Sequence, residues 1–464
     1  MDTKTLSHQN RSKNVWAASL SNLMSGYNLN IINIVVIILG ELYGPEVVNT
    51  ETKGILSASS LIGCVLGQLL FGFIGDWVGR KTGLLICNIL NIVGCIGCAL
   101  SFSIGSFSFI WFILLWRIIL GLGNGGVYPL SAVISAESAD SGKKESVGAF
   151  VYCINGVGWM ISPMIAWILL EIFPDNNSRE YVWRGLCLIG ALPCIAVLCI
   201  QSTETGIKMK NAQKEDRPSL FTLLRQKENI PRLLGTGGSW FIFDINCYGQ
   251  AIFATTVVEC IFHSTNDSIL EAKSLTLFNG IALIGSIAAI PFIKYMGLKV
   301  TQVQGFICRS ILFFICAIFI NSIENNPMLL VTIYSATFFW SNFGPGTTTF
   351  LLPAAVFPAE IRATMNGFAA ALGKVGAALG AYGYEALIHN GGKESTVMYI
   401  SGSLAFAACI LTIIFINKNI DIEAKENRKK LCHSYVHDDD TITEDLVDKN
   451  LSIHDGITII VEQQ

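Results

Sequence analysis

The chain has 464 residues, of which 52% are hydrophobic and 14% are charged, and its mean hydropathy is +0.53. A water-soluble domain of this length needs far more charge to cover its surface, so the composition excludes one. The formal net charge of −3 says little about partners, since a membrane protein sorts its charges by side, and no nucleic-acid partner is predicted.

The apolar residues run in blocks of about twenty, the length that crosses a hydrocarbon core of about 30 Å. Residues 1–14 are polar, and the first block is too long for the apolar part of a cleavable signal peptide. We predict an all-α polytopic membrane protein with twelve transmembrane helices. The predicted spans are 15–40, 54–75, 82–101, 107–136, 146–170, 182–201, 233–258, 274–295, 300–322, 327–355, 364–389 and 396–417.

The longest polar gap, 202–232, divides the spans into an N-terminal half, 15–201, and a C-terminal half, 233–417. Placing the N-terminus in the cytosol leaves most loop Lys and Arg residues inside, seven of them in 202–232, and only five outside. The tail, 418–464, carries KENRKK and then DDD, and is predicted to be mostly disordered and cytosolic. No organelle address is recognised, which favours the plasma membrane.

The 14 cysteines fall almost entirely inside apolar blocks, so we interpret them as small buried hydrophobes rather than a disulfide framework. Cys95 and Cys98 form a CxxC without a second pair or a histidine cluster nearby. No metal or cofactor is therefore predicted. An enzyme is not predicted either, because no nucleophile–base set or phosphate-cradling loop is found.

The segment 72–81 reads GFIGDWVGRK and follows the second span. Its glycines allow close helix approach, and Asp76 can pair with a basic residue or with the N-terminus of a neighbouring helix. We predict that Asp76, Gly79 and Arg80 act in gating. The segment resembles the signature of the major facilitator superfamily, and a faint repeat of it, IKYMGLK at 293–299, follows the eighth span.

The fourth span contains 116–131, WRIILGLGNGGVYPLS. An arginine inside a span is costly and normally faces the bundle interior, so Arg117 is predicted to place positive charge in the cavity. The run resembles the fourth helix of the phosphate:proton symporter family, within the same superfamily. That family implies two six-helix halves that rock about a midplane site.

The seventh span contains 240–248, WFIFDINCY, in which Trp240, Asp244 and Tyr248 share one helical face. A lone carboxylate within a span is by default functional, and Asp244 is the candidate for proton coupling. A structural role as partner of Arg117 or Lys374 is the open alternative. The family resemblance implies that Trp240, Asp244 and Tyr248 line a phosphate site.

The tenth and eleventh spans carry 342–364, NFGPGTTTFLLPAAVFPAEIRAT, and 371–377, ALGKVGA, which resemble the same helices of that family. Lys374 is an intramembrane ammonium that can hold an anion. The predicted substrate-binding residues are Tyr128, Asn155, Trp240, Asp244, Tyr248, Asn342 and Lys374.

The chain departs from the family where the family carries acids or larger amides. Where the family has two aspartates in the first helix, this chain has Ser25 and Asn28, and where it has an aspartate in the fourth helix, this chain has Val127. The fifth-helix glutamine of the family is replaced by Asn155, the asparagine after Gly-Pro by Gly346, and the tenth-helix glutamate by Ala355. Asp244 is then the only acid deep in a span. Basic groups outnumber it, which favours an anionic substrate.

The leading hypothesis is alternating-access transport of inorganic phosphate coupled to protons, with phosphate or another small anion, protons and the lipid bilayer as partners. A facilitator or symporter of another small solute, an organic phosphate, carboxylate or sugar, stays open, because the smaller side chains would enlarge the site. A non-transporting nutrient sensor is the third possibility.

Overall fold

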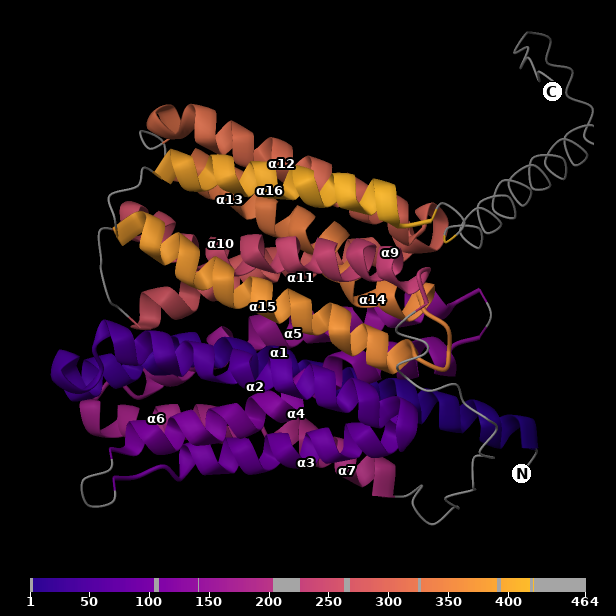
Figure 1. Ribbon diagram of the computed structural model, residues 1–464. Coiled ribbons are helices and arrows are strands. Elements are labelled where there is room, and N and C mark those ends of the chain that lie inside the picture. Colours follow the sequence, from indigo (N-terminus) through magenta and orange to yellow (C-terminus); the bar gives the residue numbers. More distant parts are fainter. Residues whose placement is uncertain are drawn as a thin grey trace, which may run out of the picture.

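The computed structural model describes residues 3–103, 108–140, 142–202, 226–262, 268–323, 327–389, 394–417 and 420. Throughout this part of the chain the regular structure is helical, with no strands (Figure 1). The predicted central loop, 202–232, and the predicted tail, 418–464, lie largely outside the described residues, so the expectations for them stay predictions.

Each predicted span of the N-terminal half is helical. The helices are α1 (Thr3–Val47), α2 (Thr50–Trp77), α3 (Arg80–Ala99), α4 (Phe109–Ser138), α5 (Lys144–Ile172), α6 (Asn176–Ile189) and α7 (Leu192–Ser202). The sixth span was expected as one helix over 182–201 but is divided between α6 and α7. Pro193 explains the break, because it has no amide hydrogen to donate to the preceding turn.

Each predicted span of the C-terminal half is helical too. The elements are α9 (Asn229–Leu233), η1 (Leu234–Gly238), α10 (Ser239–Phe262), α11 (Ser268–Met296), α12 (Leu298–Ile323), α13 (Pro327–Ser341), η2 (Asn342–Gly346), α14 (Thr347–Val356), α15 (Arg362–His389) and α16 (Glu394–Phe415). The π-helical turns η1 and η2 interrupt the seventh and tenth spans. Wide turns of this kind often occur at functional sites.

Among the described residues, nine helical stretches are long and apolar enough to cross a membrane, with α6 and α7 together counted as one of them. The other three predicted spans, 233–258, 327–355 and 364–389, coincide with the two π-interrupted runs and with α15. The predicted fold class, an all-α membrane protein with two six-helix halves, is confirmed. Figure 1 shows the halves side by side, with α15 and α11 facing α1, α2 and α5.

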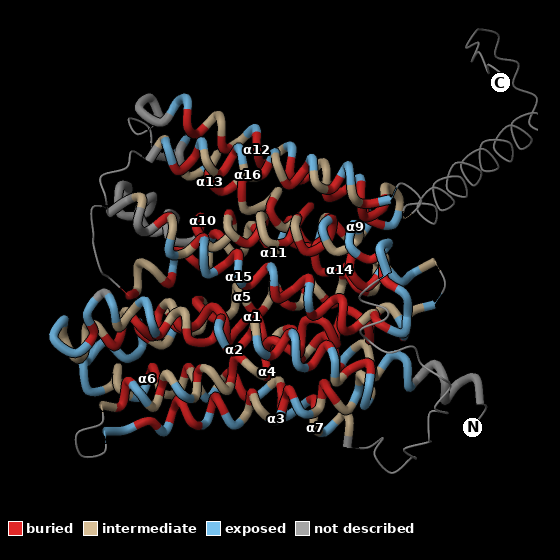
Figure 2. The backbone as a smooth tube through the Cα atoms, viewed as in Figure 1, coloured by how far each residue is buried: buried red, intermediate tan, exposed pale blue. Residues whose placement is uncertain are grey.

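The two halves meet backbone to backbone at α2 and α15. A Cβ atom on Gly72 would lie 2.8 Å from the carbonyl oxygen of Ala363, and one on Gly367 would lie 2.3 Å from that of Gln68. Glycine at both positions therefore permits the close contact. Figure 2 shows buried residues along the packed faces of the helices and exposed ones on the outer faces and at the helix ends.

The repeated segment has the same backbone feature in both halves. Gly79 begins α3 with φ +123°, and Gly297, between α11 and α12, has φ +87°. These values suit glycine and strain other residues. The final lysine of the repeat, Lys299, donates from Nζ to the carbonyl oxygens of Ile413 (2.9 Å) and Ile416, and so closes the end of α16.

Candidate functional site

A buried charged cluster lies where α10 packs against α15. The Nζ atom of Lys374 lies 3.1 Å from Oδ2 of Asp244 and also donates to the hydroxyl of Tyr248 at 3.1 Å. Lys374 is 4% exposed and Asp244 is 3% exposed, so the ion pair is shielded from solvent. Close approach of the two helices depends on Gly376, where a Cβ atom would lie 2.2 Å from the carbonyl oxygen of Phe241.

The N-terminal half contributes Tyr128 and Asn155 to the same place. The Lys374 ammonium lies 5.5 Å from the centre of the Tyr128 ring, within the range of a cation–π contact. The Tyr128 hydroxyl donates to Oδ1 of Asn155 at 3.5 Å, and Asn155 donates from Nδ2 to the carbonyl oxygen of Asn22 at 2.9 Å. Trp240 completes the cluster, with its ring centre 6.5 Å from that of Tyr128.

Asn342 joins this region through a residue that the sequence analysis missed, Tyr152. The Tyr152 hydroxyl donates to Oδ1 of Asn342 at 3.3 Å. The Phe350 ring lies 5.5 Å from Tyr152 and 6.1 Å from Tyr128, centre to centre, and links the two tyrosines. The helical spacing offered a signal, because Tyr152 precedes Asn155 by three residues and so shares its face of α5.

The two buried arginines contact neutral groups. Arg117 donates to the carbonyl oxygen of Asn28 at 3.1 Å and to the Ser60 hydroxyl at 2.7 Å. Arg309, in α12, is fully buried and donates to the side-chain oxygen of Gln250 at 2.6 Å. In the described part of the chain neither arginine forms an ion pair with a carboxylate, and no contact of Arg117 with the Lys374 cluster is found.

Asp76 joins the two halves at one end of the bundle. Its carboxylate accepts from the backbone N–H of Thr364 at 2.7 Å and of Ala363 at 3.3 Å, in the first turn of α15. Arg80 lies 3.2 Å from Asp76 and 3.3 Å from Glu137, and donates to the carbonyl oxygen of Ala359. An acid at a helix N-terminus is stabilising, so these contacts join the two halves at this end.

Glu41, which the sequence did not predict as a site residue, joins the two halves at the opposite end. Its carboxylate accepts from the backbone N–H of Ser268 at 2.9 Å and from the Ser268 hydroxyl at 3.0 Å, where α11 begins. Arg179 pairs with the same carboxylate. A second ion pair, Lys273 with Glu171 at 2.9 Å, also joins the halves here. An acid at the end of an apolar span is too common to be a signal by itself.

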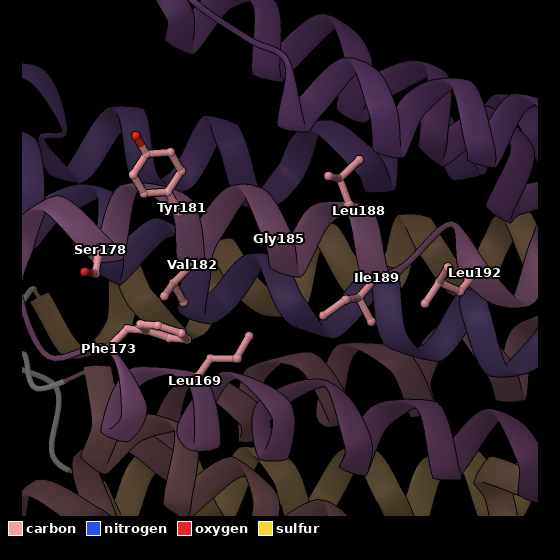
Figure 3. A pocket seen from close by; sticks show the side chains of 9 residues that line it. All are labelled: Leu169, Phe173, Ser178, Tyr181, Val182, Gly185, Leu188, Ile189 and Leu192. Carbon is pink, nitrogen blue, oxygen red and sulfur yellow. The ribbon is translucent and has the colours of Figure 1, made fainter.

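An apolar groove of about 660 Å³ lies between the end of α5 and α6. Figure 3 shows the hydroxyls of Ser178 and Tyr181 at one end of the groove and Leu192 at the other. The side chains that line it include no charged group. This groove therefore lacks the chemistry for an anion, and the charged cluster around Lys374 is the candidate site.

A polar cluster between two helical halves that contact each other at both ends of the bundle is the architecture of a solute transporter. The family model of the Major Facilitator Superfamily matches residues 18–381, so the chain belongs to that superfamily.

Curated relatives and solved structures agree with this assignment. The chain is 29% identical over 455 residues to "Probable inorganic phosphate transporter 1-6" of Arabidopsis thaliana, covering 83% of this chain and 87% of the relative. It is 27% identical to "Inorganic phosphate transporter PT2" of Toxoplasma gondii, covering 86% and 71%. The proton:xylose symporter XylE, bound to a bromodeoxyglucose, superposes with a TM-score of 0.73 at 18% identity, covering 88% of this chain and 96% of XylE.

Proposed function

We propose that the protein transports inorganic phosphate across a membrane, coupled to protons, by alternating access between its two halves. The observation that carries the proposal is the buried ammonium of Lys374 at the meeting point of the halves, bonded to Asp244 and Tyr248. An ammonium in this position is a binding group for an anion. Several similar proteins are named inorganic phosphate transporters, which supports inorganic phosphate as the transported anion.

The charge balance of the interior supports an anionic substrate. Asp244 offsets the charge of Lys374, whereas Arg117 and Arg309 contact only neutral groups among the described residues. Buried positive charge without a counter-ion is costly, and a bound anion would reduce that cost. Phosphate also offers several acceptor oxygens, which suit the hydroxyl and ring N–H donors of Tyr128, Tyr248 and Trp240.

Proton coupling follows from competition for Lys374. A proton on Asp244 neutralises the carboxylate and ends its pairing with Lys374, which leaves the ammonium to hold phosphate. Loss of that proton restores the ion pair and displaces the anion. The acid of this exchange is Asp244, since the first-, fourth- and tenth-helix positions that are acidic in the resembling family are Ser25, Asn28, Val127 and Ala355 here.

The contacts at the two ends supply the gates. Asp76, with Arg80 and the glycine turn at Gly79, closes one end, and Glu41 closes the other. Alternating access requires that each gate opens while the other stays closed. The bias of Lys and Arg residues supports a cytosolic location for the Asp76 end and both termini, and we assign the protein to the plasma membrane.

The test is uptake of radiolabelled phosphate into proteoliposomes with and without an inward proton gradient. We expect the gradient to accelerate uptake and Asp244→Asn to abolish it. Tyr27→Phe is the matched control, because Tyr27 is equally buried but donates to the carbonyl oxygen of Leu186, outside the cluster. Uptake indifferent to the gradient would refute proton coupling, and absence of phosphate uptake by the wild type would refute the substrate.

A further inference from the structure

Gly346, in the π-helical turn η2, looks at first like a position that enlarges the site. It stands where the resembling family carries an asparagine. The space beside it is nevertheless occupied. A Cβ atom on Gly346 would lie 2.9 Å from the Tyr152 hydroxyl, 3.0 Å from the carbonyl oxygen of Ser341 and 3.1 Å from Oδ1 of Asn342. A Cβ atom so close would force the Tyr152 hydroxyl to shift, so glycine is what allows the hydroxyl to lie where it does.

Tyr152 reaches this position from the other half of the molecule. It belongs to α5, whereas Gly346 and Asn342 belong to η2. The Phe350 ring packs against the Tyr152 ring with centres 5.5 Å apart, which holds the ring in place. Its hydroxyl then crosses the boundary between the halves and donates to Oδ1 of Asn342.

The hydrogen bond also fixes the Asn342 side chain. Its Oδ1 faces Tyr152, and its Nδ2 donates to the carbonyl oxygen of Phe338 at 3.4 Å. One N–H of the amide group therefore points along the helix, and the second is left for another acceptor. Without the Tyr152 hydroxyl, only the long hydrogen bond to the Phe338 carbonyl oxygen would set which way round the amide lies.

We infer that Tyr152 is a specificity-determining residue: it fills the space beside Gly346 and orients Asn342, and so limits the site to an anion the size of inorganic phosphate. The inference rests on the proposed function, since it concerns which phosphate compounds that site accepts. Organic phosphates carry a substituent on one oxygen, and the Tyr152 ring and hydroxyl occupy the room that such a substituent needs.

Comparing the uptake of two substrates of different size tests whether Tyr152 limits the size of the anion. Uptake of radiolabelled inorganic phosphate and of radiolabelled glycerol 3-phosphate is measured in proteoliposomes containing wild type, Tyr152→Ala or the control Tyr27→Phe. We expect Tyr152→Ala to raise the ratio of glycerol 3-phosphate to phosphate uptake at least about tenfold, the usual effect of a change in pocket size. Tyr27→Phe should leave the ratio unchanged. An unchanged ratio in Tyr152→Ala would overturn the inference.

A double-mutant cycle tests the contact itself. Gly346→Ala alone brings a methyl group against the Tyr152 hydroxyl and should reduce phosphate uptake about tenfold or more, whereas Tyr152→Phe removes the oxygen and makes room for that methyl. The double variant should lose less uptake than the two single losses added together, because one of the three close contacts at Gly346 is gone. A loss in the double variant equal to that sum would overturn the inference.

Separate controls distinguish a failure of the role of Tyr152 from misfolding of a variant and from a failure of the proposed function. Each variant is compared at equal reconstituted amount and only if it elutes as a single species in size-exclusion chromatography. If Tyr152→Ala fails this check, the double-mutant cycle decides the question alone. Failure of wild type to take up phosphate would refute the proposed function, whereas normal phosphate uptake without the expected selectivity change would refute only the role of Tyr152.

Discussion

The ion pair between Lys374 and Asp244 allows stability and transport to be tested in the same variants. The two charged atoms are 3.1 Å apart, and the side chains are 5% and 4% exposed. At an effective dielectric constant of about 20, their attraction is about 5 kcal/mol. Burial cancels much of this gain, but removing one partner strands the other charge and costs about 3–5 kcal/mol. Lys374→Met and Asp244→Asn should therefore each lower the melting temperature, by on the order of 4 °C for a chain of this length.

The double variant, Asp244→Asn with Lys374→Met, separates the two roles. It strands no charge, so its melting temperature should return to within about 1 °C of wild type, in line with neutral replacements of buried ion pairs. Its phosphate uptake should stay absent, because both the ammonium and the acid are gone. Thermal unfolding in one detergent and uptake at equal protein content measure the two properties. A double variant that transports phosphate at the wild-type rate would refute the role proposed for these charges.

Three further predictions concern the ends of the bundle. Asp76→Asn should speed hydrogen–deuterium exchange at the start of α15, because the backbone amides there lose a charged acceptor worth about 1.5–3 kcal/mol per bond. Glu41→Gln should do the same at the start of α11 while leaving α15 unchanged; faster exchange at both ends would contradict independent gates. Gly79→Ala should destabilise the protein by about 1–3 kcal/mol because its φ of +123° lies in a region that other residues rarely adopt, whereas Gly54→Ala, in an open helical position, should not lower the melting temperature.

The fold was predictable because each span is encoded locally. A block of about twenty apolar residues must become a helix in a membrane, where every backbone group needs a partner within the segment. The breaks inside spans were less predictable. Pro193 divides α6 from α7, and η1 and η2 are single wide turns in otherwise ordinary helices. Such features depend on how neighbouring helices pack, so the hydropathy of the sequence does not reveal them.

The candidate site was predictable only where its residues share a helix. The spacing of four residues places Trp240, Asp244 and Tyr248 on one face, and the structure gathers them near Lys374. Contacts between distant segments were harder to foresee. Arg117 binds a backbone carbonyl, which leaves no sequence signal, and Tyr152 has a role only because Gly346 leaves room for it across the boundary of the halves.

The two proposed gates use the same kind of hydrogen bond, and the strength of these bonds determines whether the proposed cycle can run. In each, a carboxylate of the N-terminal half accepts hydrogen bonds at the first turn of a helix of the C-terminal half, and an arginine supports it. Hydrogen bonds to a charged group contribute about 1.5–3 kcal/mol each, whereas moving a two-state equilibrium from 1:99 to 99:1 takes about 5.5 kcal/mol. Two or three such bonds are therefore enough to keep a gate closed. They are also few enough to break when substrate binding favours the state in which that gate is open.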